Sequence, residues 1–320
     1  YANGEKKSAI AITEPGAGSD PAGMKTRAEY KNGKWIINGQ KIFISNARQA
    51  DFIIVMAVTD PAKGSRGGIT AFLVDKGTKG LSIPTVLNTI GEHAPYGVYF
   101  DDVEVPRERL FIDCNLKLYN SVMTTNWPPN IQQQTMIRAS VKLDFAWGLA
   151  LRMAASINAA DPETMRMIGE LWGYAEFTRS AIVAAEAEAR EWPGGLWTGA
   201  SAPLHALRAF LPLWMPRANE ILRLIGSHNL LAAPMAAELA DKDLRPLIDK
   251  YLPGAKGQAA EERIRIFRLA WDFAGSALAS RNEQYERFYL ASSPRNLARH
   301  LTFTDRSRAD RLVDRFLKEP

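Results

Sequence analysis

The pattern of apolar and polar residues divides the chain into two parts with different periods. Between residues 8 and 112, short apolar runs rich in β-branched residues alternate with clusters of Gly, Pro, Asn and Asp. The runs are SAIAIT, WIINGQKIFIS, DFIIVMAVT, ITAFLVD, LSIPTVL and GVYFDDVEV. Closely spaced short strands of this kind are typical of an antiparallel sheet or barrel. The first part therefore predicts an antiparallel, barrel-like β domain over residues 1–112.

From about residue 116 onward the pattern has a helical period. In the stretch EERIRIFRLAWDFAGSALASRNEQYERFY, apolar residues recur at steps of three and four: Ile264, Phe267, Trp271, Ala274 and Leu278. This spacing places them on one side of a single helix.

Capping residues indicate where other helices begin and end. Asp161 followed by Pro162 predicts the capped start of a helix, and the pair Gly194-Gly195 is expected to end it. Four or five long helices with short connections predict a helical bundle over residues 113–320. The expected fold class is α+β, in which the β domain precedes the helical domain.

Composition narrows the class of protein further. The chain has 320 residues, 46% of them hydrophobic, and no apolar run approaches the roughly 18 residues that span a bilayer. A single cysteine, Cys114, excludes an internal disulfide framework. The net charge of +5 is interspersed with acidic residues, which argues against a nucleic-acid surface. We expect a cytoplasmic protein without membrane or nucleic-acid partners. No metal site is expected either, because the four histidines are far apart in sequence: His93, His205, His228 and His300.

The first residues of the chain resemble an internal segment of a longer sequence. Tyr1 is not a methionine, and the sequence runs directly into a strand without a signal peptide. We therefore expect that an N-terminal segment precedes this chain.

A glycine-rich loop, ITEPGAGSDPAG at residues 12–23, carries the candidate chemistry. Gly16 and Gly18 fit the first two positions of the dinucleotide motif G-x-G-x-x-G, but Pro21 occupies the third. An Asn-Gly turn between two strand-like runs follows, so a β-hairpin is expected where that motif needs a helix. A strand end with Thr and several backbone amides suits a flat, polar-edged heterocycle with phosphates. A plain turn between strands fits the same spacing, and the loop alone leaves both interpretations open.

Three segments of the first part, AITEPGAGSDPAG, NGKWIINGQKIFISNA and YFDDVEVPRERLF, closely resemble the middle β-domain of the acyl-CoA dehydrogenase superfamily. The resemblance implies FAD as the cofactor, and it alone implies that the segment preceding this chain is a helical domain. By position it implies contacts with the flavin ring and pyrophosphate at six residues: Ile12, Thr13, Gly18, Ser19, Phe43 and Ser45. Phe43 stands where the superfamily usually has tryptophan and Ser45 where it has threonine, so an aromatic face and a hydroxyl are retained.

The second part lacks the motifs of an acyl-CoA dehydrogenase. It has no Arg-x-x-Phe-Gly, Gln-x-x-Gly-Gly or Arg-Asp…Glu-Gly-Thr segment, and no glutamate in a motif that marks a catalytic base. Four other segments, in order, resemble the C-terminal helical domain of the 4-hydroxyphenylacetate 3-monooxygenase family, the oxygenase component of two-component flavin hydroxylases. They are TMIRASVKLDFAWGLA, IGELWGYAEFTRSAIVAAEAEA, EILRLIGSHNLLAAP and ERIRIFRLAWDFAGSALASRNEQYERFY.

Within this second resemblance, the segment GSHN matches a loop that approaches the cofactor. It adds four candidate cofactor-binding residues: Gly226, Ser227, His228 and Asn229. A helix C-cap at which Gly226 ends the preceding helix is the simpler interpretation, and the two are compatible. Another set matches a family pattern, but charged residues at helical spacing are usually structural: Arg281, Glu283, Tyr285 and Glu286.

The two resemblances together imply an FAD-dependent monooxygenase that hydroxylates a phenolic or other aromatic substrate with O2. Reduced FAD is supplied by a partner flavin reductase, and the assemblies of the family imply a homotetramer. The residues that bind the phenol lie largely in the family's N-terminal segment, so the catalytic residues are unknown. Two alternatives stay open: an acyl-CoA dehydrogenase-like oxidoreductase, and a non-catalytic, flavin-free subunit that serves assembly.

Overall fold

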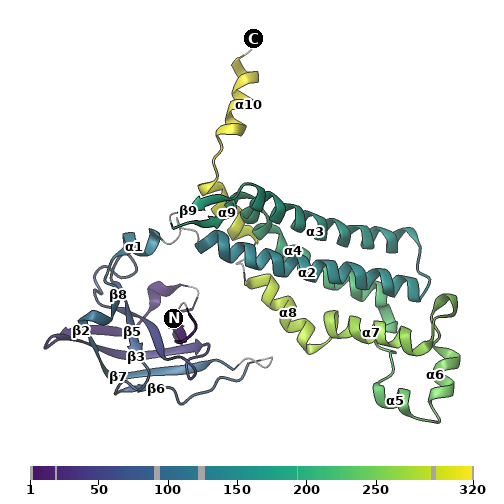
Figure 1. Ribbon diagram of the computed structural model, residues 1–320, viewed down its shortest axis with the longest axis horizontal. Helices are drawn as coiled ribbons and strands as arrows, with labels where there is room; N and C mark the ends of the chain where they lie inside the picture. The colour runs from purple at the N-terminus through teal and green to yellow at the C-terminus, as the bar shows by residue number, and fades with distance from the viewer. Residues whose placement is uncertain are drawn as a thin grey trace. The chain divides into compact units, whose positions relative to one another are not determined.

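The chain divides into two compact units, Tyr1–Thr125 and Asn126–Pro320, and each is described by itself. Figure 1 shows the strands of the first unit in purple and blue and the helices of the second in teal, green and yellow. The sequence places the boundary after residue 112, whereas helix α1 (Leu116–Ser121) belongs to the first unit. The structure, a computed structural model, describes residues 3–18, 20–89, 94–121, 127–192, 194–289 and 293–318.

The first unit is built on one mixed sheet of eight strands. Neighbouring strands follow the order β6-β7-β3-β2-β4-β5-β8, and β1 pairs with β4. Most pairs are antiparallel, but β1 and β2 both run parallel to β4. The bounds are β1 Ser8–Ala11, β2 Arg27–Lys31, β3 Lys34–Ile44, β4 Phe52–Val58, β5 Ile69–Asp75, β6 Leu81–Ser82, β7 Tyr96–Pro106 and β8 Leu110–Ile112.

The two parallel pairs correct the expectation of a purely antiparallel, barrel-like sheet. Strand β1 pairs with β4 from Phe52 to Val55, and β2 pairs with it at Val58. The chain therefore runs along one edge of β4 in a single direction, and the glycine-rich loop leaves the sheet between the two strands. Among the described strands, β6 and β8 are the two ends of the pairing order. The sheet is accordingly mixed, with no pairing between those ends to close it.

One hydrophobic core holds this sheet together. Strand β4 alternates buried and partly buried residues along its length, the period-two pattern of a strand packed on one face. Buried side chains from strands far apart in the pairing order share the core, among them Val55 of β4, Phe72 of β5 and Val103 of β7. The Trp35 ring of β3 meets Phe72 edge-on at 5.5 Å between centroids. Because distant strands share one core, the sheet must be strongly curved.

The hairpin predicted after the glycine-rich loop is confirmed. Strands β2 and β3 pair antiparallel from Arg27 with Asn38 to Lys31 with Lys34. Asn32 and Gly33 form the turn with φ of +51° and +83°. Two consecutive positive φ values give the turn whose twist matches that of the strands, and Asn-Gly is the pair that adopts it most readily.

In the second unit, three long helices pack around a common core. They are α2 (Trp127–Ser156), α3 (Pro162–Ala187) and α4 (Ser201–Gly226). The predicted cap of α3 is confirmed, because the Asp161 carboxylate accepts from the Thr164 amide at 3.0 Å. The remaining helices are α5 (Ala236–Ala240), α6 (Arg245–Tyr251), α7 (Ala260–Ala274), α8 (Ala277–Phe288), α9 (Ser293–Phe303) and α10 (Ser307–Lys318).

The structure corrects two sequence predictions in this unit. The helix expected from the periodic apolar stripe is two helices, because α7 ends at Ala274 and Ser276 caps α8 through the Ala279 amide. The pair Gly194-Gly195 does not end a helix. It lies instead between the strands β9 (Arg190–Trp192) and β10 (Leu196–Thr198), which form a small hairpin.

Neither a helix that could span a membrane nor a cluster of metal-binding side chains occurs in the described residues. None of the helices in the described ranges is long and apolar enough to cross a bilayer. Within those same ranges, His, Cys, Asp and Glu side chains form no group of three or more that suits a metal ion.

Candidate functional site

The glycine-rich loop begins where β1 ends and closes into a tight turn. Ile12 and Thr13 follow the strand and are half-buried. The backbones of Glu14 and Ala17 then exchange two hydrogen bonds, at 3.0 and 3.1 Å. A three-residue 3-10 turn, Pro21–Gly23, follows and leads to β2. The loop thus lacks the long helix that a Rossmann phosphate loop requires.

The end of β3 lies beside this loop. The Ile42 amide donates to the Thr13 carbonyl at 2.9 Å, which joins the two segments directly. The pairing of β3 with β7 is irregular between Lys41 and Ile44, so the strand bulges at this point. Phe43, inside the bulge, has φ of +59° and is 56% exposed. A bulky residue with positive φ carries backbone strain, and such strain concentrates at functional sites.

A buried ion pair lies beneath both segments. Lys41 Nζ donates to Glu14 Oε1 at 2.8 Å and to the Ile12 carbonyl at 3.0 Å. The Glu14 carboxylate also accepts from the amides of Lys25 and Thr26, at 2.6 and 3.0 Å. Burial lowers the pKa of Lys41, and the bond to Glu14 partly offsets this effect. Burial raises the pKa of Glu14, but its hydrogen bonds outweigh burial and hold the pKa below its ordinary value.

The exposed groups of this region fit a flat heterocycle that carries phosphates. Phe43 offers an aromatic face, and among the described residues the Thr13 hydroxyl has no hydrogen-bond partner. A Cβ placed on Gly16 or Gly18 would meet no atom within 4 Å, so glycine leaves the backbone open to an approaching group. An aromatic face, a hydroxyl and an open backbone are groups of the kind that would hold a flavin ring and its phosphates.

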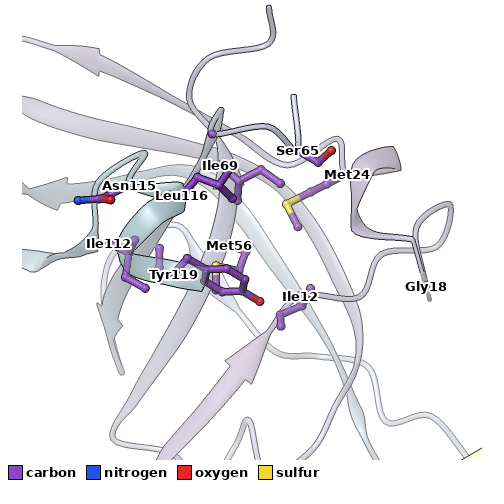
Figure 2. A pocket seen from close by; sticks show the side chains of 12 residues that line it. Ile12, Gly18, Met24, Met56, Ser65, Ile69, Ile112, Asn115, Leu116 and Tyr119 are labelled. Carbon is purple, nitrogen blue, oxygen red and sulfur yellow. The ribbon is translucent and has the colours of Figure 1, made fainter. Parts of the chain in front are cut away.

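A cavity of about 230 Å³ adjoins the loop, on the side of β4, β5 and α1. Figure 2 shows the Tyr119 ring near Met56 and Ile12, with Met24 on the neighbouring segment. The wall is mostly apolar, and Ile12 and Gly18 contribute to it from the glycine-rich loop. The loop therefore borders a mostly apolar cavity as well as the exposed surface beside Phe43.

The segment GSHN ends α4 in the second unit. Gly226 is buried, and a Cβ on it would come within 2.5 Å of Leu230 and 2.9 Å of Met153. Its φ is −71°, whereas Ser227, the residue that caps the helix, has φ of +46°. Gly226 is thus needed for close packing, and the positive φ expected there falls on Ser227.

The other two residues of this turn differ in exposure. The His228 ring is exposed, and its Nδ1 lies 3.5 Å from the Ser227 hydroxyl. The Asn229 side chain accepts from Arg263 of α7 at 2.8 Å, which ties the turn to that helix. Ser227 and His228 are therefore the residues of this segment that face outward.

Five of the ten residues that the sequence assigned to the cofactor lie in the described part of the first unit. Ile12 and Thr13 lie beside Phe43, and Gly18 and Ser45 are exposed on the same loop and strand end. GSHN belongs to the second unit and forms a separate candidate region. Ser19 lies outside the described residues, as does His93.

Sequence reasoning missed the Glu14–Lys41 pair. Glutamate in a turn and lysine in a strand are ordinary surface residues by type, yet here their side chains are 5% and 0% exposed. The partners lie 27 residues apart, so no local spacing connects them. The sequence offered one weak signal, a lysine directly before the apolar residues Ile42, Phe43 and Ile44 at the end of β3.

A second buried carboxylate, Glu286, lies in the second unit at a position that the sequence interpreted as structural. Glu286 of α8 is 5% exposed and forms ion pairs with Arg138 and Lys142 of α2. The Arg138 guanidinium lies over the stacked rings of Tyr285 and Tyr289. Burial raises the pKa of Tyr285, and Tyr289 raises it further. Here the family pattern at Tyr285 and Glu286 corresponds to a contact between helices, as the structural interpretation predicts.

The fold and the loop together define an acyl-CoA dehydrogenase-like flavoprotein fold. Residues 9–103 match the family model described as acyl-CoA dehydrogenase, middle domain. The chain is 46% identical over 109 residues to (R)-benzylsuccinyl-CoA dehydrogenase of Thauera aromatica, an alignment that covers 34% of this chain and 27% of that protein.

The helical part matches a narrower family than the β unit does. Residues 120–318 match the family model described as 4-hydroxyphenylacetate 3-hydroxylase C terminal, and the chain belongs to this family. It is 30% identical over 261 residues to the 4-hydroxyphenylacetate 3-monooxygenase oxygenase component of Thermus thermophilus. That alignment covers 77% of this chain and 54% of the relative, so the chain spans about half of the relative's length.

Solved structures agree with this assignment. The oxygenase component of 4-hydroxyphenylacetate 3-monooxygenase, complexed with FAD and 4-hydroxyphenylacetate, superposes with a TM-score of 0.79 at 27% identity. The superposition covers 99% of this chain and 71% of that one. Both units therefore have counterparts in an enzyme that binds FAD.

Proposed function

We propose that this chain belongs to an FAD-dependent monooxygenase, the oxygenase component of a two-component system, that hydroxylates a phenolic substrate. The observation that carries the proposal is the family match of the helical part over residues 120–318. The β unit alone does not select this function, because its loop is common to dehydrogenases and hydroxylases. A partner flavin reductase, a homotetramer and a cytoplasmic location belong to the same proposal.

The proposed FAD site uses both candidate regions. In the first unit, the Phe43 ring packs against the flat face of the flavin, and the hydroxyls of Thr13 and Ser45 bond to its polar edge. The remaining loop residues, Ile12, Gly18 and Ser19, border the ring and the pyrophosphate. In the second unit, the turn Gly226–Asn229 supplies a further contact, from the same or another subunit.

Reduced FAD, when bound, supplies the activation of O2 and the transfer of one oxygen atom to the aromatic ring. The chain's own residues bind the flavin and orient it. Phe43 and Ile12 cover apolar ring surface and thereby exclude water from it, which favours productive transfer over side reactions. The cavity beside Ile12 and Tyr119 has a mostly apolar wall, which disfavours water next to the ring. Fixed placement of the reacting groups then lowers the barrier.

A product assay tests the proposal. The full chain is supplied with FAD, a flavin reductase, NADH, O2 and 4-hydroxyphenylacetate, and the products are identified by mass spectrometry. We expect a catechol that carries one oxygen atom from 18O2. Formation of no hydroxylated product by a preparation that demonstrably binds both FAD and 4-hydroxyphenylacetate would contradict the proposal.

The rival function is acyl-CoA oxidation. It is favoured by the β unit, which is 48% identical over 104 residues to cyclohex-1-ene-1-carbonyl-CoA dehydrogenase of Geobacter metallireducens. The helical part, however, lacks the motifs of that superfamily, including one that marks a base for the α-proton. Acyl-CoA substrates with an artificial electron acceptor separate the two, because enoyl-CoA formation would support the rival.

A further inference from the structure

The Glu14–Lys41 pair contacts every segment of the first unit from which the proposed flavin site is built. Lys41 Nζ is bonded to the Ile12 carbonyl and to Glu14. The Glu14 carboxylate holds the two amides that lead into β2. Lys41 is also the residue at which the bulge that presents Phe43 begins. The loop, the start of β2 and the end of β3 are thus joined at one point beneath the surface.

Stability alone does not explain such a pair. Removing two charges from water is costly, and apolar residues of similar volume often stabilise a core as well as a buried ion pair does. What a hydrogen-bonded ion pair adds is geometry, because its donors and acceptors fit in one arrangement only. Here the bond from Lys41 fixes the carbonyl group of Ile12, and the bond from the Ile42 amide fixes the carbonyl group of the next residue, Thr13.

We propose that Glu14 and Lys41 form a positioning pair that holds Thr13 and Phe43 in the flavin-binding arrangement before the cofactor arrives. The inference rests on the proposed function. Both side chains are buried, so the pair acts through the backbones of the loop and of β3 and does not touch the cofactor. A site assembled in advance binds more tightly because less ordering remains to be done on binding.

The test compares the double variant Lys41→Met with Glu14→Gln against the wild-type chain. This variant removes both charges together, so neither is left unpaired in the core. We expect it to fold, by far-UV circular dichroism, and to bind FAD roughly 10- to 100-fold more weakly, by analogy with the loss of a supporting partner at metal sites. We also expect a changed visible circular dichroism of the bound flavin, which a uniform loss of stability would not produce.

The matched control is Lys34→Met, on the same strand. Lys34 pairs with Glu104 at 2.7 Å, but this pair is 53% and 58% exposed and lies at the other end of β3. It should leave the FAD affinity and the flavin spectrum unchanged. A folded double variant with wild-type affinity and spectrum would overturn the inference and leave the proposed function standing. Failure of the wild-type chain to bind FAD would overturn both.

A measurement on the unaltered chain covers the case in which the double variant does not fold. Amide hydrogen exchange is followed with and without FAD in the peptides that contain Glu14, Ala17 and Ile42. We expect these amides to be protected already without FAD, as the hydrogen bonds at 3.0, 3.1 and 2.9 Å imply. Rapid exchange that slows only when FAD is added would show that the cofactor assembles the site, and would overturn the inference.

Discussion

Phe43 combines a large apolar ring, an exposed position and a positive φ. The left-handed conformation costs a bulky residue about 1–2 kcal/mol relative to the ordinary one. Burial of the ring does not offset this cost within the described unit, because 56% of the residue is accessible. The fold therefore maintains an unfavourable conformation at a residue that points outward. A ligand that stacks on the ring accounts for both the strain and the exposure.

The first prediction concerns Phe43→Asn. Asparagine tolerates positive φ, so the flavin-free chain should keep its stability or gain about 0.5–1 kcal/mol. The loss of the aromatic face should weaken FAD binding about tenfold, as measured by fluorescence titration. Phe111→Asn is the control, because Phe111 is 55% exposed on β8 and outside the proposed site. Equal FAD affinities of Phe43→Asn and wild type would contradict the assignment.

The second prediction concerns the turn after α4. Ser227 has φ of +46° and ψ of −138°, a region that favours glycine. Ser227→Gly should therefore raise the free energy of unfolding by about 1 kcal/mol, measured by urea denaturation. Ser227→Ala is the control, because it removes the hydroxyl and keeps the strain. If Ala stabilises the chain as much as Gly does, the effect is not due to the backbone.

At this scale, some of the site could be read from the sequence and some could not. Thr13 and Phe43 each stand in a continuous sequence motif, which can be recognised without the structure. The hydrogen bond from Ile42 to Thr13 brings the two segments together. The Glu14–Lys41 pair depends on a contact that exists only after β3 lies against the loop, so residue type alone could not reveal it. The assignment of Ser19 to the cofactor stays a prediction.

At the scale of elements, Glu170 links α3 to α4. Its carboxylate accepts from Arg217 at 2.9 and 3.2 Å and from the Tyr174 hydroxyl at 2.6 Å. Tyr174 in turn stacks on Trp214 of α4, with ring centroids 4.9 Å apart. The hydrogen bonds from Arg217 lower the pKa of Glu170 to about 2, against the effect of burial, and Tyr174 and Arg166 add to this. Burial and Glu170 raise the pKa of Tyr174 to about 12.

The third prediction follows from the lowered pKa of Glu170. The carboxylate is charged in the folded state down to pH about 2 but takes up a proton near pH 4.5 in the unfolded state. Its contribution to stability is therefore complete above pH 4.5 and is lost as the pH falls toward 2. With allowance for partial exposure, this contribution is roughly 1–2 kcal/mol.

Unfolding of wild type and Glu170→Gln over this pH range provides the measurement. The difference in free energy should be largest at neutral pH and should shrink steadily in acid. Glu163→Gln is the control, because Glu163 is 64% exposed and bonds only within its own helix to Arg166, so a much smaller difference is expected. A difference between wild type and Glu170→Gln that does not vary with pH would contradict the assignment.

Element prediction succeeded where the signal is local. The Asn32-Gly33 turn and the Asp161 cap are decided by a few neighbouring residues. The break between α7 and α8 was missed because the apolar spacing continues through Gly275. There the turn packs under the Trp271 ring, which a Cβ on Gly275 would approach within 2.4 Å. The two parallel strand pairs were missed because they depend on the path of the loop, which no periodicity encodes.

On the scale of the whole molecule, the change of period near residue 116 predicts two parts, and the chain forms two compact units. The two units support different parts of the proposed function. The β unit provides the flavin-type loop, and the helical unit assigns the family through residues 120–318. The substrate-binding residues could not be predicted, because the chain spans about half the length of its Thermus thermophilus relative.

We have proposed that the loop 12–18 and the end of β3 form the floor of a flavin site. The most direct test is reconstitution of the flavin-free chain with excess FAD, followed by gel filtration and measurement of the flavin-to-protein ratio from the absorption spectrum. The account predicts one FAD per chain and a resolved flavin spectrum that differs from that of free FAD. A chain that is folded yet elutes without flavin, in the oxidised and in the reduced state, would contradict it.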